Sequence, residues 1–220
     1  MTKTEVRNRI EEIGIVPAVR VSMPEYATFA AEALHHANIP IAEITMTVPN
    51  AIGVIARLAR DLPDMVVGAG TVLDAETASR CLVAGAKFLT SPGLVMEVLE
   101  FALKNDVVYF PGVLTPTEVI AAWKAGADFV KIFPCAQVGG PNYIRALKVP
   151  LPQIPLIASG GVNQKTTVSF IMAGATAVGI GSDLIPPEAL PRRHEAHIHE
   201  LARRYLAMVK YAREEKAART

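Results

Sequence analysis

Eight short runs of apolar and often β-branched residues recur along the chain, and this recurrence limits the fold more than any other feature. The runs are, in order, GIVPAVRV (14–21), IPIAEITM (39–46), DMVVGAGT (64–71), AKFLTSPG (86–93), DVVYFPGV (106–113), ADFVKIFP (127–134), IPLIASGG (154–161) and TAVGIGSD (176–183). Stretches with helical spacing separate most of them, such as MPEYATFAAEALHHAN (23–38) and TPTEVIAAWKAGA (115–127). Strands that are apolar throughout and separated by helices are typical of a parallel sheet covered by helices.

Eight strand–helix units in 220 residues predict an α/β fold, a (β/α)8 TIM barrel. A doubly wound open sheet is the alternative, since periodicity alone does not exclude it. That alternative is disfavoured because no GxGxxG motif follows the first run, and GAGT (68–71) is weak evidence for a dinucleotide site. We expect residues 1–220 to form one barrel domain with a charged C-terminal helix from about residue 190.

The charge balance argues against two classes of partner. With 22 basic and 21 acidic residues the net charge is +1, which gives no electrostatic footprint for nucleic acid or for an anionic membrane.

Cys81 and Cys135 are too few for a disulfide framework, and the N-terminus lacks the apolar core of a signal peptide. No run approaches the roughly 18 apolar residues of a membrane span. We therefore expect a cytoplasmic protein with a small neutral or anionic ligand.

In a barrel of this kind the functional side chains lie at the carboxyl ends of the strands. The polar residues found there are Arg20, Glu43, Thr45, Thr47, Thr71, Ser91, Lys131, Ser159 and Ser182.

Lys131 is the most informative of these residues because it places an ammonium inside the apolar run ADFVKIFPC (127–135). A buried ammonium is costly unless it is paired or neutral, so Lys131 must either meet a carboxylate or lose its proton. A neutral lysine attacks ketones to form a Schiff base, which accepts electrons when the bond two carbons away breaks. The alternatives are a lysine that reaches solvent from the strand end, or a structural ion pair with Glu43.

Glu43 and Arg20 are the charged candidates on the first two strands. Glu43 lies within the apolar segment AEITMT (42–47), and a buried carboxylate near a buried lysine is what proton transfer to and from an imine requires. The other interpretation of Glu43 is the same structural ion pair. Arg20, in PAVRV (17–21), offers a rigid fork suited to a carboxylate, although it could equally lie in solvent.

Two glycine-containing segments follow the last two runs. ASGGVN (158–163) and GIGSDL (179–184) bring Gly160, Gly161 and Gly181 together with the hydroxyls of Ser159 and Ser182. Either segment alone is more often a tight turn. On adjacent strands, at the position where many barrels bind phosphate, they predict a phosphate site.

Four further residues are not expected to carry chemistry. His194, His197 and His199 do not share one helix face in the manner of HExxH, which indicates a solvated face and no metal site. Cys135 has no evident histidine partner and is interpreted as a buried thiol.

These residues together resemble the class I 2-keto-3-deoxy-6-phosphogluconate (KDPG) and 4-hydroxy-2-oxoglutarate (KHG) aldolases. The similarity runs from about Val16 to Leu184. It is carried, in the family's order and spacing, by AEITMTVP, VVGAGTVLD, SPGL, PGVLTPTEV, FVKIFP, GGPNYIRALKVPLP, SGGVN and GIGSDL.

The resemblance implies a role for each candidate. Lys131 would form the Schiff base with the 2-keto acid, Glu43 would be the acid/base, Thr71 would help hold the substrate carboxylate, and Phe133 would pack against the reacting carbons. The phosphate would be cradled by Gly160, Gly161, Gly181 and Ser182. The family resemblance also implies a homotrimer without metal or organic cofactor.

The chain departs from some members of that family at one position. Those members carry an arginine four residues after the glutamate, where this chain has Thr47. Other members use an arginine at the end of strand one, which matches Arg20, so we assign carboxylate binding to Arg20 with Thr71. The branch acting on the galactonate epimer tends to have an apolar residue before the paired glycines; Ser159 stands there in this chain and favours the gluconate substrate.

The resulting hypothesis is reversible cleavage of KDPG to pyruvate and glyceraldehyde 3-phosphate, so the expected partners are a phosphorylated 2-keto acid and pyruvate. A first alternative is the same chemistry on the galactonate epimer or on unphosphorylated KHG. A second is a metal-dependent aldolase or isomerase in which Glu43 is a ligand and Lys131 is structural. A third is a phosphate-sugar binding barrel without catalysis.

Overall fold

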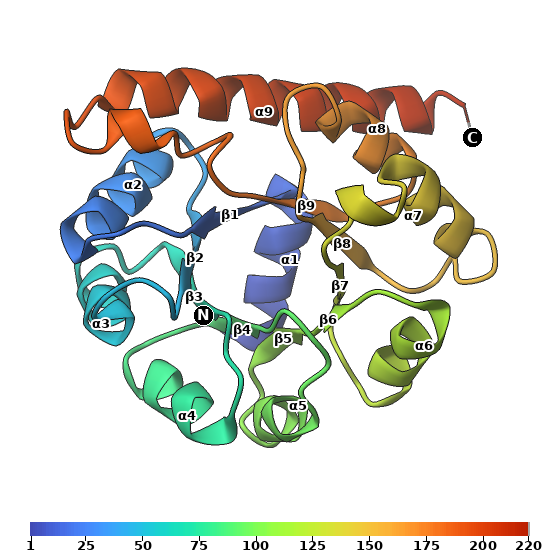
Figure 1. Cartoon of the computed structure of the whole chain (residues 1–220), viewed down its shortest axis with the longest axis horizontal. Coiled ribbons are helices and arrows are strands. Elements are labelled where there is room, and N and C mark those ends of the chain that lie inside the picture. The colour runs from blue at the N-terminus through green and yellow to red at the C-terminus, as the bar shows by residue number, and fades with distance from the viewer. Residues whose placement is uncertain (220) are drawn as a thin grey trace.

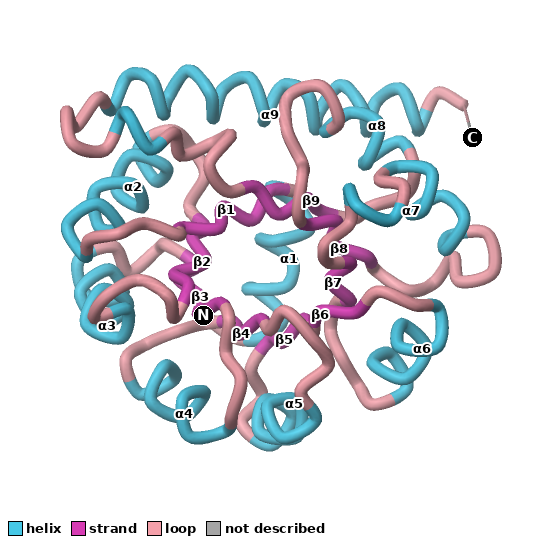
Figure 2. Tube along the Cα trace, viewed as in Figure 1, coloured by secondary structure: helices cyan, strands magenta, loops and turns pink. Residues whose placement is uncertain are grey.

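A computed structural model describes residues 1–219 of the chain and shows a TIM barrel of parallel strands with helices outside (Figure 1). Every strand pairing is parallel, and the strand order around the barrel is β5-β4-β3-β2-β1-β9-β8-β7-β6. Figure 2 shows the strands as a ring that the helices surround. The predicted fold class is therefore confirmed, and the doubly wound sheet is wrong.

The elements alternate along the chain as the sequence predicts. The strands are β1 (Ile15–Val19), β2 (Ile41–Thr45), β3 (Val66–Gly70), β4 (Phe88–Thr90), β5 (Val108–Phe110), β6 (Gly112–Val113), β7 (Val130–Ile132), β8 (Leu156–Ser159) and β9 (Ala177–Ile180). The α-helices are α1 (Lys3–Ile13), α2 (Pro24–His36), α3 (Ala51–Asp61), α4 (Ala75–Val83), α5 (Met96–Lys104), α6 (Pro116–Lys124), α7 (Pro141–Lys148), α8 (Thr167–Met172) and α9 (Glu195–Ala217). Two short 3₁₀ helices are η1 (Ala136–Val138) and η2 (Pro187–Ala189).

The fifth apolar run differs from the prediction because it forms two strand segments, β5 and β6, on either side of Pro111. Proline has no N–H to donate to a ladder, which interrupts the strand at that residue. The chain nevertheless continues along the barrel wall: Asp128 N–H donates to Tyr109 O (3.2 Å) and Lys131 N–H to Pro111 O (2.9 Å). These bonds join the start of β7 to the β5–β6 segment and close the ring.

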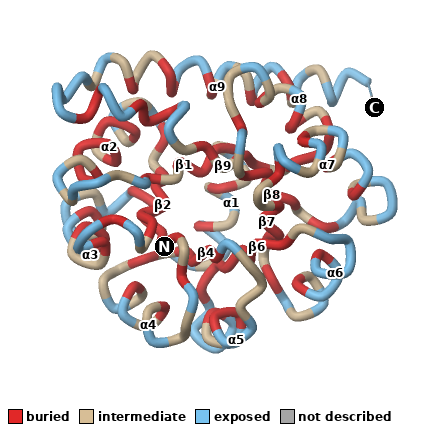
Figure 3. The backbone as a smooth tube through the Cα atoms, viewed as in Figure 1, coloured by how far each residue is buried: buried red, intermediate tan, exposed pale blue. Residues whose placement is uncertain are grey.

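The N-terminal end of the barrel is closed by α1, a helix that was not predicted from the sequence. Val6 and Ile10 of α1 are buried against a layer of strand residues that includes Phe88, Phe110 and Phe129. Figure 3 shows the barrel wall almost entirely buried, with exposed residues on the outer faces of the helices. Apolar side chains thus fill the interior of the barrel at this end.

The C-terminal helix α9 lies across one side of the barrel, over α2 and α8 (Figure 1). It begins at Glu195, a few residues after the predicted start, because residues 187–194 form η2 and turns. Its buried residues, among them Ile198, Tyr205 and Val209, lie on one face, so this charged helix is part of the packed structure. Within residues 1–219, no helix is long and apolar enough to cross a membrane.

Candidate active site

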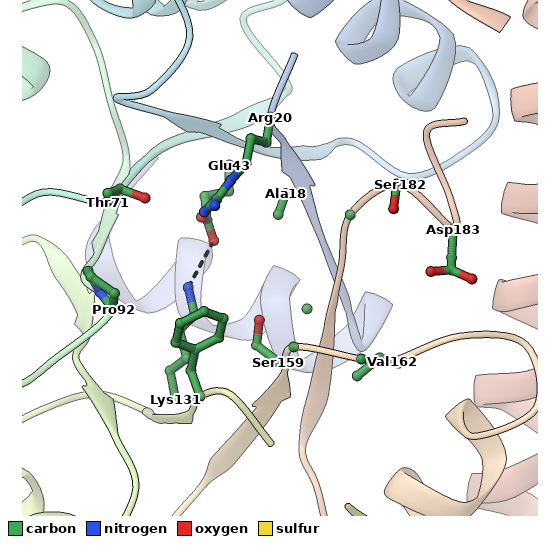
Figure 4. A pocket seen from close by; sticks show the side chains of 15 residues that line it. Ala18, Arg20, Glu43, Thr71, Pro92, Lys131, Ser159, Val162, Ser182 and Asp183 are labelled. Atoms are coloured by element: carbon green, nitrogen blue, oxygen red, sulfur yellow. Dashed lines mark ion pairs between the residues drawn. The ribbon is translucent and has the colours of Figure 1, made fainter. Parts of the chain in front are cut away.

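One pocket of about 290 Å³ opens at the carboxyl end of the barrel, and all ten predicted site residues line it (Figure 4). They are Arg20, Glu43, Thr71, Lys131, Phe133, Ser159, Gly160, Gly161, Gly181 and Ser182. The structure thus brings together residues from several strands and the loops that follow them.

Lys131 of β7 and Glu43 of β2 face each other across the interior of the barrel. Lys131 Nζ lies 3.7 Å from Glu43 Oε2, and only 10% and 5% of the two side chains are exposed. The dashed line in Figure 4 marks this contact. Three strands lie between β2 and β7 on one side of the ring. Lys131 and Glu43 therefore meet across the interior of the barrel and do not come from adjacent strands. The buried lysine therefore meets the buried carboxylate that the sequence offered as its partner.

Two further groups surround the ammonium. Lys131 Nζ donates a long hydrogen bond to Thr90 Oγ1 (3.4 Å), and it lies 5.5 Å from the centre of the Phe133 ring. Thr90 is fully buried at the end of β4. The Lys131 ammonium thus has one carboxylate, one hydroxyl and one aromatic ring around it.

Gly70, at the end of β3, leaves the space that the Glu43 carboxylate occupies. A Cβ placed on Gly70 would lie 2.1 Å from Glu43 Oε1 and 2.6 Å from its Cδ. The second glycine of GAGT thus has a packing role beside the acid, which explains the motif without a dinucleotide site. Gly179 likewise leaves space for the Ser159 side chain, since a Cβ on Gly179 would lie 2.7 Å from Ser159 Oγ.

Arg20 and Thr71 lie at the rim of the pocket. Arg20 follows β1, and its guanidinium has no ion-pair partner within residues 1–219, so it is available to a ligand. Thr71 has a φ of 61°, a left-handed conformation that costs energy for a β-branched residue. Hydrogen bonds of the next residue fix this backbone conformation: Val72 N–H donates to Thr90 O (3.1 Å), and Val72 O accepts from Ser91 Oγ.

The two glycine segments meet at the other end of the pocket. Gly160 and Gly161 have φ values of 86° and 83°, and a Cβ on Gly161 would lie 2.3 Å from Ala136 Cβ. Leu184 and Ile185 N–H both donate to Gly181 O (3.0 Å), which forms a helical turn beginning at the second segment. Figure 4 shows Ser182 on the side of the pocket away from Lys131, with Ser159 between them.

Asp183 lines the pocket although it was not among the predicted site residues. Its carboxylate lies beside Ser182, is exposed, and has no hydrogen-bond or ion-pair partner within the described residues 1–219. The signal for it in the sequence is its position directly after Ser182 in GIGSDL. Ala18, Pro92, Val162 and Gly179 also line the pocket but carry no functional side-chain group.

Three of the polar strand-end residues do not reach the pocket and instead stabilise the barrel. Thr45 Oγ1 donates to Val19 O (3.2 Å) and lies 2.7 Å from Thr47 Oγ1. Ser91 Oγ accepts from the hydroxyl of Tyr109 (2.8 Å). Thr90, immediately before Ser91, is the hydroxyl that meets Lys131, because adjacent residues point to opposite faces of a strand; Thr90 was not among the polar strand-end residues found in the sequence.

The remaining candidates lie outside the pocket. Burial raises the pKa of the Cys135 thiol to about 12, in agreement with its interpretation as an inert buried cysteine. Within residues 1–219, the one set of three His, Cys, Asp or Glu side chains close enough to hold a metal ion together is His36, Glu195 and His199. Glu43 is not among them, and its carboxylate faces Lys131 instead.

Comparison with known proteins gives a consistent result. The family model described as KDPG and KHG aldolase matches residues 6–201. A 2-dehydro-3-deoxy-phosphogluconate aldolase from Pseudomonas aeruginosa is 30% identical over 195 residues, which is 89% of each chain. A probable 2-dehydro-3-deoxy-6-phosphogalactonate aldolase from Rhizobium meliloti is 33% identical over 178 residues, covering 80% of this chain and 84% of the relative.

The solved structures include a similar barrel with a reaction intermediate. It is KDPG aldolase from Legionella pneumophila, with pyruvate captured at low pH as a covalent carbinolamine intermediate. Its TM-score to this chain is 0.83 at 30% sequence identity, covering 90% of this chain and 96% of that one.

Proposed function

The chain belongs to the KDPG and KHG aldolase family, and we propose that it is a class I aldolase that reversibly cleaves KDPG to pyruvate and glyceraldehyde 3-phosphate. The observation that carries the proposal is the buried contact of 3.7 Å between Lys131 Nζ and Glu43 Oε2 inside the ligand pocket. The two groups are the nucleophile and the acid/base that Schiff-base chemistry needs, and they are close enough to exchange a proton through one small shift or one water.

The first step is formation of the Schiff base. Transfer of a proton from the Lys131 ammonium to Glu43 gives a neutral amine, which adds to the C2 ketone of the substrate. The resulting carbinolamine takes a proton on its oxygen and loses water, which leaves a protonated imine on Lys131. The covalent carbinolamine of pyruvate in the Legionella relative supports this route.

The second step breaks the carbon–carbon bond. Glu43 removes the proton of the C4 hydroxyl as the C3–C4 bond breaks, and the electron pair of that bond moves to the protonated imine. Glyceraldehyde 3-phosphate leaves and an enamine remains on Lys131. Glu43 then returns a proton to C3 of the enamine, and hydrolysis of the imine releases pyruvate and restores the lysine.

Substrate orientation comes from groups at both ends of the pocket. The free guanidinium of Arg20, with Thr71, would bind the carboxylate next to the reacting ketone. Ser182 and the glycine segments at 160–161 and 181 would bind the phosphate at the far end. Phe133, beside the lysine, would cover the reacting carbons. Fixing both charged ends places C2 at the amine, which is where much of the rate enhancement originates.

The choice of substrate depends on the region around Ser159. This hydroxyl lines the pocket between Lys131 and Ser182, where the C4 and C5 hydroxyls of a six-carbon substrate would lie, and it favours the gluconate substrate over the galactonate epimer. Measuring kcat/KM for KDPG, the galactonate epimer and KHG tests this. We expect KDPG to be the best substrate; a higher kcat/KM for either of the others would replace it with the alternative specificity.

A lysine variant tests the reaction class. Lys131→Ala should lose turnover on all three substrates, while Lys124→Ala, on the outer helix α6, should keep it. Thermal unfolding of both variants checks that the fold is retained. Full activity in Lys131→Ala would contradict the proposal. Activity lost to EDTA and restored by a divalent ion would favour the metal-dependent alternative.

We also propose that the chain is a cytoplasmic homotrimer, as the family resemblance implies, and that its reaction belongs to the Entner–Doudoroff pathway. Exposed apolar side chains on α4, α5 and α6 support association of copies: Val83, Met96, Leu103 and Ile120 are all exposed. Helices α4 and α5 lie side by side, and α6 is the next helix around the barrel in Figure 1. Light scattering would show a particle of about 71 kDa, three times the 23.6 kDa chain. A mass near 24 kDa would exclude the trimer.

A further inference from the structure

His36, Glu195 and His199 gather on the outside of the barrel, where the N-terminal end of α9 meets the C-terminal end of α2 (Figure 1). Glu195 Oε1 lies 2.8 Å from His36 Nδ1 and 3.2 Å from His199 Nε2. The three donor atoms all lie within 4.8 Å of one another. None of the three residues lines the ligand pocket.

Two packed helices hold this cluster in place. Glu195 and His199 are four residues apart on α9, so their side chains lie on the same face one turn apart. His36 is the last residue of α2, where the helix carries a partial negative charge that favours a bound cation. The cluster therefore joins side chains from two elements, with His36 and Glu195 159 residues apart in the sequence.

The present contacts leave one nitrogen unsatisfied. His199 Nε2 is a buried atom with no hydrogen-bond partner within residues 1–219, although the Glu195 carboxylate is nearby. The cluster thus offers a carboxylate and two imidazole nitrogens in one place, and one of these nitrogens has no hydrogen bond.

The neighbouring charged side chains are engaged elsewhere and do not occupy the Glu195 carboxylate. Arg203 and Arg204 both pair with Glu200, and Arg193 lies over the ring of Phe29. His35, adjacent to His36, pairs with Asp64.

We propose that His36, Glu195 and His199 form a binding site for a divalent transition metal, with Zn²⁺ the best fit. Two imidazoles and one carboxylate are a common zinc ligand set, with bonds of about 2.0–2.2 Å. Ligand atoms at such distances in a tetrahedron lie roughly 3.3 Å apart, close to the two measured separations. A water would complete the four ligands of the ion.

A metal at this position would tie α9 to α2 and so fix the C-terminal helix to the barrel. Metal bound to the folded chain but not to the unfolded one stabilises the fold by mass action. The expected effect is on stability, and the proposal is independent of the aldolase reaction.

The test uses the full chain and Zn²⁺ alone. After treatment with EDTA and its removal, titration calorimetry should show one Zn²⁺ per chain, and Zn²⁺ at about 100 times its dissociation constant should raise Tm by about 5–10 °C. His36→Ala and His199→Ala should each weaken binding at least about tenfold and remove the rise in Tm. Binding should also weaken as the pH falls, because protons compete for the imidazoles.

His197→Ala is the matched control, since His197 lies on the same helix outside the cluster. It should bind Zn²⁺ like the natural sequence. The proposal is wrong if no stoichiometric Zn²⁺ binds, if binding survives in both His36→Ala and His199→Ala, or if His197→Ala loses it to the same extent. Because all three substitutions are at partly or fully exposed positions, unfolding curves without metal should be similar and would reveal any variant that fails to fold.

Discussion

Replacing Gly70 by alanine should separate catalysis from stability in this barrel. The new Cβ would lie 2.1 Å from Glu43 Oε1, so the carboxylate must move by roughly 1.3 Å to reach the 3.4 Å at which ordinary contact begins. The three nearest atoms, Oε1, Cδ and Cγ, all belong to the Glu43 side chain and none to the backbone, and Gly70 itself is not in the left-handed region. The substitution therefore displaces the acid/base from Lys131 while the barrel stays folded.

The expected magnitude follows from the sensitivity of catalysis to position. A misplacement of about 1 Å costs on the order of 10²-fold in rate, so kcat/KM should fall about 100-fold. The free energy of unfolding should fall by about 1–3 kcal/mol, the usual cost of overpacking, because the displaced side chain is buried. Steady-state cleavage of KDPG and urea unfolding measure the two quantities.

Two other glycines provide the controls. A Cβ on Gly68 would lie 2.2–2.4 Å from three atoms of the Phe88 ring in the core, so Gly68→Ala should cost stability, about 1–3 kcal/mol or more. A Cβ on Gly93 would have no atom within 4 Å, so Gly93→Ala should change neither quantity. Wild-type kcat/KM in Gly70→Ala would refute the placement of Glu43 as the acid/base. A loss of activity no greater than in Gly68→Ala would do the same.

Three further outcomes are expected. Asp183→Asn removes an unpaired negative charge from the pocket, so the KM for the phosphorylated substrate should fall by up to about fivefold, and by less at high salt. An unchanged KM would mean that the Asp183 carboxylate does not face the phosphate. Burial raises the pKa of Cys81 to about 11 and that of Cys135 to about 12, so at most about one thiol in a thousand is ionised at pH 8. Neither cysteine should therefore react quickly with a thiol reagent until urea unfolds the chain. Thr115→Ala removes the N-terminal capping box of α6 and should cost about 1 kcal/mol at pH 7. The backbone N–H groups of Thr115 and Leu114, which donate to Glu118 and lower its pKa, are kept in this variant. The variant loses the bond from Glu118 N–H to Thr115 Oγ1, which does not depend on the charge of Glu118, so most of the difference in stability should persist at acid pH; a difference that disappears there would contradict this origin.

The barrel could be predicted because its signal is repeated. Each strand is an apolar run of a few residues, and the alternation with helices leaves few other architectures. The prediction failed in detail at Pro111, where a missing N–H divides one run into β5 and β6. It also missed α1 and α7, although α1 begins with the capping box formed by Thr2 and Glu5.

The site could be predicted because charged residues are rare in buried strands. Lys131 and Glu43 stand out from apolar neighbours, and the topology of a barrel brings strand ends together whatever their distance in sequence. Thr90 was missed because the choice between it and Ser91 depends on which face of β4 turns inward, and a three-residue strand gives too little alternation to decide. The cluster of His36 with Glu195 and His199 depends on the packing of α9 on α2, which no local pattern encodes.

The Schiff base on Lys131 is tested most directly by borohydride reduction in the presence of pyruvate, followed by intact mass measurement and peptide mapping. We expect one pyruvyl adduct per chain, located on Lys131, and no adduct in Lys131→Ala. An unmodified chain that is folded, or an adduct on a different lysine, would contradict the proposed reaction, because the buried contact between Lys131 and Glu43 would then be a structural ion pair.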